Sequence, residues 1–159
     1  ISMFLSTILP VVEDKILFRE YPLDFGWNDK HYFSKRFPMA RWDKNSSVEQ
    51  IFNLSKVAVF TTASTGYLET LASNFCTIII LTKERQVRED ARPYFDALEE
   101  AGILHKDFSS AAIHINRYWH EINVWWENDK VQLAIRSFVN RFARDSDNLP
   151  EELFRVFQK

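Results

Sequence analysis

The chain has 159 residues, with 20 lysines and arginines against 22 aspartates and glutamates, so its formal charge is −2. Its apolar fraction of 46% excludes intrinsic disorder, and the near-neutral charge offers no electrostatic footprint for nucleic acid. Only three glycines are present, whereas average usage is about 7%, so a glycine-rich phosphate loop is excluded.

The first segment, residues 1–9, is apolar but too short to span a membrane, and it has no basic region typical of a signal peptide. The chain begins at Ile1 in the middle of an apolar pattern, so we expect it to be part of a longer protein. The one cysteine, Cys76, lies in the apolar run 76–81, which favours a reduced, buried thiol. We therefore expect a cytoplasmic protein, and peripheral association with the inner membrane stays open.

Short apolar runs along the chain predict β-strands. The clearest are residues 15–19, 56–60 and 77–81, and weaker candidates are residues 39–42 and 103–105. Uninterrupted apolar runs of this length are typical of strands that are buried on both faces, as in parallel sheets.

Helical patterns alternate with these strands. Ser47 and Gln50 form a capping-box pattern at the start of residues 47–54, residues 65–73 carry apolar side chains at helical spacing, and residues 91–101 end at Gly102. This alternation predicts an α/β fold, a doubly wound Rossmann-like parallel sheet with flanking helices.

From about residue 109 the pattern is helical to the end of the chain. A break at residues 147–150 precedes a last predicted helix over residues 151–157, and Trp125 lies outside the apolar stripes, so we expect it to be exposed at an interface. Two stripes are expected to face the core: Ile115, Trp119, Ile122 and Trp126, then Val131, Ile135, Phe138 and Phe142. With no linker or repeat, residues 1–159 are predicted to form a single domain with helices from about 109 onward.

A hydroxyl-rich turn is the most suggestive feature. Thr62, Ser64 and Thr65 follow the strand at residues 56–60 and precede a helix, where unpaired N–H groups and the helix dipole favour a phosphate. Gly66 would allow a ligand to approach closely, and Glu69 could accept hydrogen bonds from sugar or ribose hydroxyls. The alternative is ordinary capping of the helix by Ser or Thr, with Glu69 complementing the dipole.

Arginines are the second group of candidates. Arg19 ends the first strand, at the edge of the hydroxyl-rich turn if the strands are parallel, and it could hold a phosphate through two N–H bonds. Arg85 and Arg88 follow the strand at residues 77–81, although neighbouring acids neutralise much of their charge. The alternative for Arg19 is a surface arginine paired with Glu20 or Asp24, and the alternative for Arg85 and Arg88 is a solvated loop and helix start.

The sequence gives little support for a metal site or for a nucleophilic catalytic residue. The four histidines show no metal-ligand spacing, so no metal site is expected, and there is no GxSxG motif. The sequence assigns no catalytic residue.

Residues 55–79 read SKVAVFTTASTGYLETLASNFCTII and resemble the C-terminal half of a family of bacterial surface-polysaccharide (O-antigen) biosynthesis transferases. Residues 19–22, 91–98, 101–105 and 125–126 match as well, so the resemblance covers about residues 15–142. The Ser-Thr-x-x-x-Glu pattern of this turn recurs in many GT-B glycosyltransferases and related glycerophosphotransferases.

The resemblance implies a GT-B-like enzyme with two Rossmann-like halves, of which the C-terminal half binds the nucleotide-activated donor without a bound metal. It implies that Ser64 and Thr65 lie by the donor diphosphate, that Glu69 faces a hydroxyl and that Arg19 approaches the leaving phosphate. Tyr21 stands where related glycerophosphotransferases have histidine, which argues against their substrates. A catalytic base would come from the N-terminal half.

The chain is therefore predicted to be the donor-binding half of a glycosyltransferase-like enzyme of cell-surface polysaccharide biosynthesis. Its expected partners are a nucleotide-activated sugar and a missing N-terminal acceptor domain; no cofactor is expected, the fragment alone is expected to be inactive, and a homo-oligomer stays open. The predicted donor-binding residues are Arg19, Tyr21, Thr62, Ser64, Thr65, Gly66, Glu69, Arg85 and Arg88. The alternative is a non-catalytic interaction module, docking through its aromatic C-terminal helices, or a nucleotide-binding regulatory module.

Overall fold

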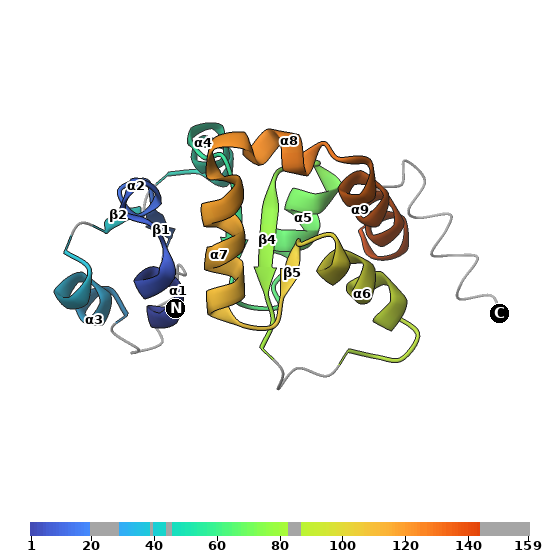
Figure 1. Cartoon of the computed structure of the whole chain (residues 1–159), viewed down its shortest axis with the longest axis horizontal. Helices are drawn as coiled ribbons and strands as arrows, with labels where there is room; N and C mark the ends of the chain where they lie inside the picture. The colour runs from blue at the N-terminus through green and yellow to red at the C-terminus, as the bar shows by residue number, and fades with distance from the viewer. Residues whose placement is uncertain (20–28, 39, 44–45, 83–86, 144–159) are drawn as a thin grey trace.

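Parallel strands in two small sheets, with helices around them, make up the fold of the computed structural model (Figure 1). The structure describes residues 1–19, 29–38, 40–43, 46–82 and 87–143. The fold is thus mixed α/β, with parallel strand pairing as the sequence predicts.

The larger sheet has the order β3-β4-β5, from β3 (Ala58–Phe60), β4 (Thr77–Ile80) and β5 (Leu104–His105). All of its pairings are parallel, with Val59 opposite Ile78 and Ile79 opposite Leu104. Every residue of β4 is buried, because helices cover both faces of this strand. The apolar run at residues 77–81 therefore forms the central buried strand that its composition predicts.

The smaller sheet pairs β1 (Leu17–Arg19) with β2 (Arg41–Asp43), also in parallel. Within the part of the chain that the structure describes, no strand ladder joins this pair to β3. The expectation of one continuous, doubly wound sheet is therefore not met. The exposure of the two strands agrees with this. The interior strands of a wide sheet are fully buried, whereas no residue of β1 or β2 is fully buried.

Helices cover the larger sheet from both sides (Figure 1). On one side, α7 (Phe108–Tyr118) packs against β4 and β5; on the other, α5 (Gly66–Ala72) packs against β3 and β4. Farther out, α9 (Asp129–Phe142) packs on α5 and on α6 (Arg92–Glu100).

The capping box predicted at residues 47–50 is confirmed at the start of α4 (Val48–Leu54). The hydroxyl oxygen of Ser47 accepts a hydrogen bond from the Gln50 N–H at 3.1 Å, and the Gln50 side chain accepts one from the Ser47 N–H at 2.8 Å. Each of these bonds satisfies a backbone donor that the helix itself leaves unpaired.

The sequence did not predict three helices near the N-terminus: α1 (Ser2–Thr7), α2 (Pro10–Glu13) and α3 (Asp29–Arg36). α1 packs against α7 and buries Phe4 and Leu5. The Asn116 side chain fixes this contact, because it accepts a hydrogen bond from the Leu9 N–H and donates one to the Thr7 carbonyl, both at 2.9 Å.

The C-terminal helical region is broken more often than its apolar stripes suggest. A 3₁₀ turn, η1 (Trp119–Glu121), separates α7 from α8 (Ile122–Trp126), and α9 follows. The last predicted helix, residues 151–157, lies outside the described residues. The predicted core positions that are buried are Ile115, Ile122, Trp126, Val131, Ile135 and Phe138, whereas Trp119 and Phe142 are only partly buried.

The expectation of an exposed Trp125 is wrong. Its side chain is 7% exposed, and its indole Nε1–H donates a hydrogen bond to the Ala101 carbonyl at 3.1 Å. The turn at η1 rotates α8 relative to α7, so that both Trp125 and Trp126 face inward. An interface built on an exposed Trp125 is therefore not available.

Cys76 is buried and free, as the sequence predicts, and burial raises the pKa of its thiol to about 12. A thiol with such a pKa is not a nucleophile near neutral pH. Among the described helices, none is long and apolar enough to cross a membrane.

Candidate functional site

The hydroxyl-rich turn forms at the end of β3, where the sequence predicts it. Thr62, Ser64 and Thr65 are all exposed, and Thr65 is the N-cap residue of α5. Thr65 has helical backbone angles and makes no side-chain capping bond, although the Leu68 and Glu69 N–H groups donate to its carbonyl. These hydroxyls are thus not used for ordinary helix capping.

Backbone donors lie beside these hydroxyls. Among the described residues, the N–H groups of Gly66 and Tyr67 make no hydrogen bond, as expected for the first turn of a helix without a cap. Glu69 is exposed, one turn into α5. The turn therefore offers several O–H donors and one carboxylate acceptor to solvent at the carboxyl end of a parallel strand, beside two N–H groups without a hydrogen bond among the described residues.

The structure gives Gly66 a role in packing. A Cβ atom added at Gly66 would lie 2.7 Å from Cε1 of Phe60, because the Phe60 ring lies across the start of α5. The absence of a side chain at this position lets the ring of the strand's last residue pack there. Donor binding through Gly66 stays a prediction.

Arg19 is exposed at the end of β1, opposite Asp43 in the strand register. Because β1 and β3 belong to different sheets in the described structure, Arg19 does not share a sheet edge with the hydroxyl-rich turn in the way the sequence suggested. Tyr21 and Arg85 lie outside the described residues.

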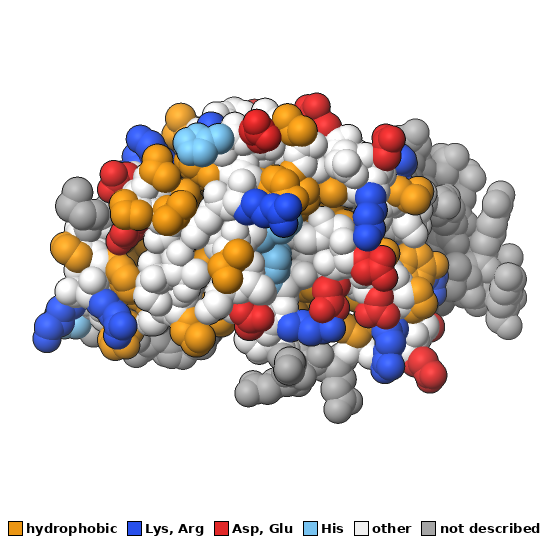
Figure 2. Space-filling view, viewed as in Figure 1, with side chains coloured by type: hydrophobic (Ala, Val, Ile, Leu, Met, Phe, Trp, Pro, Cys, Tyr) orange, Lys and Arg blue, Asp and Glu red, His pale blue; other side chains and the backbone are white. Residues whose placement is uncertain are grey.

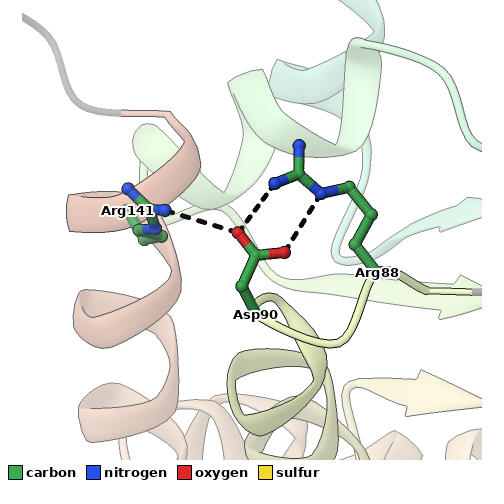
Figure 3. A network of polar contacts seen from close by, with 3 residues as sticks. All are labelled: Arg88, Asp90 and Arg141. Atoms are coloured by element: carbon green, nitrogen blue, oxygen red, sulfur yellow. Dashed lines mark hydrogen bonds and ion pairs between the residues drawn. The ribbon is translucent and has the colours of Figure 1, made fainter.

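Arg88 is paired with Asp90, one of the neighbouring acids, at the surface (Figure 3). Its Nε and Nη2 donate two hydrogen bonds of 3.0 Å to the carboxylate of Asp90, and Nη2 of Arg141 on α9 lies 3.7 Å from that carboxylate. The Arg88 side chain is 84% exposed, and exposed ion pairs contribute at most about 1 kcal/mol. Arg88 can therefore leave Asp90 for a competing anion at small cost.

A histidine cluster between α7 and the end of β5 was missed from the sequence. The ring centroids of His105 and His114 are 5.3 Å apart, and that of His114 is 4.5 Å from Trp125. Gly102 lies against the His114 ring, which leaves no room for a side chain at this position. Sequence spacing could not reveal the cluster, since α7, β5 and α8 meet only in the folded chain.

The electrostatics of this cluster favour neutral imidazoles. Burial lowers the pKa of His114 to about 4, and the charges of His105 and Arg117 add smaller contributions in the same direction. Burial also lowers the pKa of His105. The Gly102 carbonyl and the charges of Asp107 and Glu99 favour the protonated form and oppose this shift. Nε2 of His114 is buried without a hydrogen-bond partner.

We expect the free energy of unfolding to fall as the pH drops from about 6.5 to about 4. In this window the unfolded chain protonates His114 while the folded chain does not, so acid favours unfolding. His114→Phe, which keeps an aromatic ring but cannot titrate, is expected to flatten this dependence in urea denaturation measured at several pH values. His120→Gln, at an exposed position, is the matched control; an unchanged slope in His114→Phe would contradict the assignment.

One of three comparisons with known proteins gives a match. No curated protein and no solved structure matches the chain. A family model described as LIC12162 family transferase matches residues 2–157. Since this match spans nearly all of the 159 residues, the chain belongs to the LIC12162 family of transferases.

Proposed function

We propose that this transferase uses the hydroxyl-rich turn, residues 62–65, to bind a nucleotide-activated sugar for the assembly of a cell-surface polysaccharide. The observation that supports this most is the pair of exposed, uncommitted hydroxyls of Ser64 and Thr65 at the carboxyl end of β3, beside the N–H groups of Gly66 and Tyr67, which make no hydrogen bond among the described residues. In open α/β sheets, ligands bind at this end of the strands.

The donors fit the diphosphate of such a substrate. Phosphate oxygens are acceptors, and hydrogen bonds to a charged acceptor contribute about 1.5–3 kcal/mol each. Negative charge that develops on the leaving diphosphate would be stabilised by the same groups. Thr62 would add a hydroxyl donor, and Glu69 would accept hydrogen bonds from ribose or sugar hydroxyls.

Arginines complete the proposed site. Arg88 can exchange its exposed Asp90 pair for a phosphate, and Arg19 would approach the leaving phosphate, with Tyr21, Gly66 and Arg85 as further donor contacts. In this proposal the chain forms the donor-binding part of a GT-B-like enzyme, and an N-terminal acceptor domain supplies the catalytic base.

The test is a titration of the protein with UDP-, CDP- and CMP-sugars, followed by heteronuclear NMR. We expect backbone amide shifts at residues 64–69 that saturate with at least one of these donors. The matched free sugar without a nucleotide should leave these amides unchanged. If the protein is folded and none of the nucleotide sugars shifts them, the proposal is wrong.

A further inference from the structure

Two arginines from distant segments of the chain converge on one carboxylate. Arg88 holds both oxygens of Asp90, through Nε and Nη2 at 3.0 Å each, and Nη2 of Arg141 lies 3.7 Å from Oδ2 of Asp90 (Figure 3). The Oδ2 atom thus lies between two guanidinium groups. A phosphate oxygen can take the same place, because the planar fork of N–H donors in arginine suits carboxylates and phosphates alike.

These arginines lie toward the same edge of the larger sheet as the hydroxyl-rich turn, which follows the carboxyl end of β3. Arg88 and Asp90 come directly before α6, and α6 leads back to the start of β5, which is parallel to β3 and β4. The start of α6 therefore lies toward the carboxyl ends of the strands. Lys130 at the start of α9 pairs with Glu100 at the end of α6. Since Arg141 in the last turn of α9 pairs with Asp90, the two helices are antiparallel and α9 ends at this edge.

Aromatic packing holds the end of α9 against the starts of α5 and α6. The ring centroid of Phe138, one turn before Arg141, is 6.3 Å from that of Tyr67 in the first turn of α5. Phe142, which follows Arg141, packs on Tyr94 in the first turn of α6 at 5.3 Å. Arg141 is therefore carried by a fixed helix end close to the hydroxyl-rich turn.

Asp90 holds the two arginines only weakly. The side chains of Arg88, Asp90 and Arg141 are 84%, 48% and 53% exposed, and water and salt screen such ion pairs. At 3.7 Å, Arg141 is also too far from Asp90 for a hydrogen bond. The turn that carries Arg88 is fixed in contrast, because the N–H groups of Ala91 and Arg92 both donate to its carbonyl at 3.1 Å. A stronger anion can therefore replace Asp90 without unfolding this turn.

The local charge favours an anion, but only slightly. Residues 88–92 and Arg141 hold three arginines against two acids, Glu89 and Asp90, a net charge of +1. Over α6, Figure 2 shows acidic and basic side chains side by side, with no patch of one sign. The selection of an anion thus depends on the two convergent guanidiniums, and a phosphate group with two negative charges competes for them better than one carboxylate does.

We propose that Arg88 and Arg141 together bind a phosphate group of the nucleotide donor, and that Asp90 is the internal anion which this phosphate displaces. The inference rests on the proposed function, since the donor at the hydroxyl-rich turn supplies the phosphate. In the free protein, Asp90 keeps the two guanidiniums close together, which lowers the entropy cost of ordering them on the ligand. Asp90 also competes with the phosphate, so it weakens donor binding and favours release of the nucleotide after transfer.

The test is a calorimetric titration with inorganic pyrophosphate, because the two arginines contact phosphate and not the base. We expect Arg141→Gln to raise the Kd by about tenfold or more, the loss of one good hydrogen bond to a charged group. Asp90→Asn is expected to lower the Kd by about two- to fivefold, the size of one exposed ion pair. An ion pair with a merely structural role would not make the protein bind pyrophosphate more tightly when Asp90 is neutralised.

The matched controls are Arg136→Gln and Glu89→Gln, which change the net charge by the same amounts. Arg136 is exposed on α9, Glu89 is the exposed neighbour of Asp90, and neither takes part in an ion pair among the described residues. Both variants should bind pyrophosphate as the wild type does. If each control changes the Kd as much as its partner variant, the effect is one of net charge and the inference is wrong.

The remaining outcomes separate this inference from the donor proposal. If nucleotide sugars shift the amides of residues 64–69 while Arg141→Gln and Asp90→Asn leave the Kd for pyrophosphate unchanged, the arginine pair is overturned and the turn stands. If nucleotide sugars leave these amides unchanged while pyrophosphate binding responds to both variants as expected, the donor proposal fails and the arginine pair stands as a phosphate site. Absence of pyrophosphate binding to the wild type, or weaker binding to Asp90→Asn, also overturns the inference.

Discussion

Replacing Ser64 and Thr65 together by alanine is expected, under the proposed function, to lower kcat/KM for the nucleotide sugar by about 100-fold or more, with little change in Tm. Two hydrogen bonds to a charged diphosphate, each worth about 1.5–3 kcal/mol, correspond to at least this factor. Stability should be kept, because both side chains are exposed and Thr65 makes no capping bond. The measurements are initial rates over a range of donor concentrations and a thermal melt.

Ser73→Ala is the matched control, because Ser73 is the exposed residue at the opposite end of the same helix. It should retain both activity and Tm. Equal losses of activity and stability in the double variant would favour a structural role for the turn, and full activity would remove the turn from the site.

Phe138→Ala is expected to have the largest effect on stability, about 3–5 kcal/mol in the free energy of unfolding. Phe138 is 1% exposed, and its ring lies between those of Tyr67 on α5 and Phe95 on α6, at centroid distances of 6.3 and 5.1 Å. Removing it leaves a cavity where three helices meet, and native domains have only about 5–15 kcal/mol in total. Urea denaturation monitored by circular dichroism measures the loss.

The control is Leu133→Ala on the same helix, where the side chain is 63% exposed. Its loss should stay within about 0.5 kcal/mol, the usual range for surface positions. A Phe138→Ala variant as stable as Leu133→Ala would show that α9 does not depend on this packing.

The strands of the larger sheet could be predicted because their composition is decisive. Residues 77–81 are apolar on both faces, and only a strand covered by helices on both sides suits such a run. The ends of the helices were equally clear where a local pattern exists, as at Ser47 with Gln50 or at Gly102. In each case the information lies within a few neighbouring residues.

What could not be predicted depends on contacts between distant segments. Whether β1 joins β3 is decided by backbone pairing, which leaves no mark on the composition of either strand. Trp125 faces inward because η1 changes the direction of the helix, and no sequence period reports such a turn. Gly66 suggested a ligand contact, and the ring of Phe60 against it adds a packing reason for the glycine that the sequence did not reveal.

The contact that Asn116 makes with Thr7 and Leu9 has a consequence for the order of folding. Thr7 and Asn116 are 109 positions apart, so α1 leaves the ribosome long before the helix that covers it has been made. At about 5–20 residues per second, Phe4, Leu5 and Ile8 wait several seconds without their partner surface on α7. During synthesis α1 thus exposes these apolar side chains until α7 has been made, which makes it a natural binding segment for chaperones in that interval.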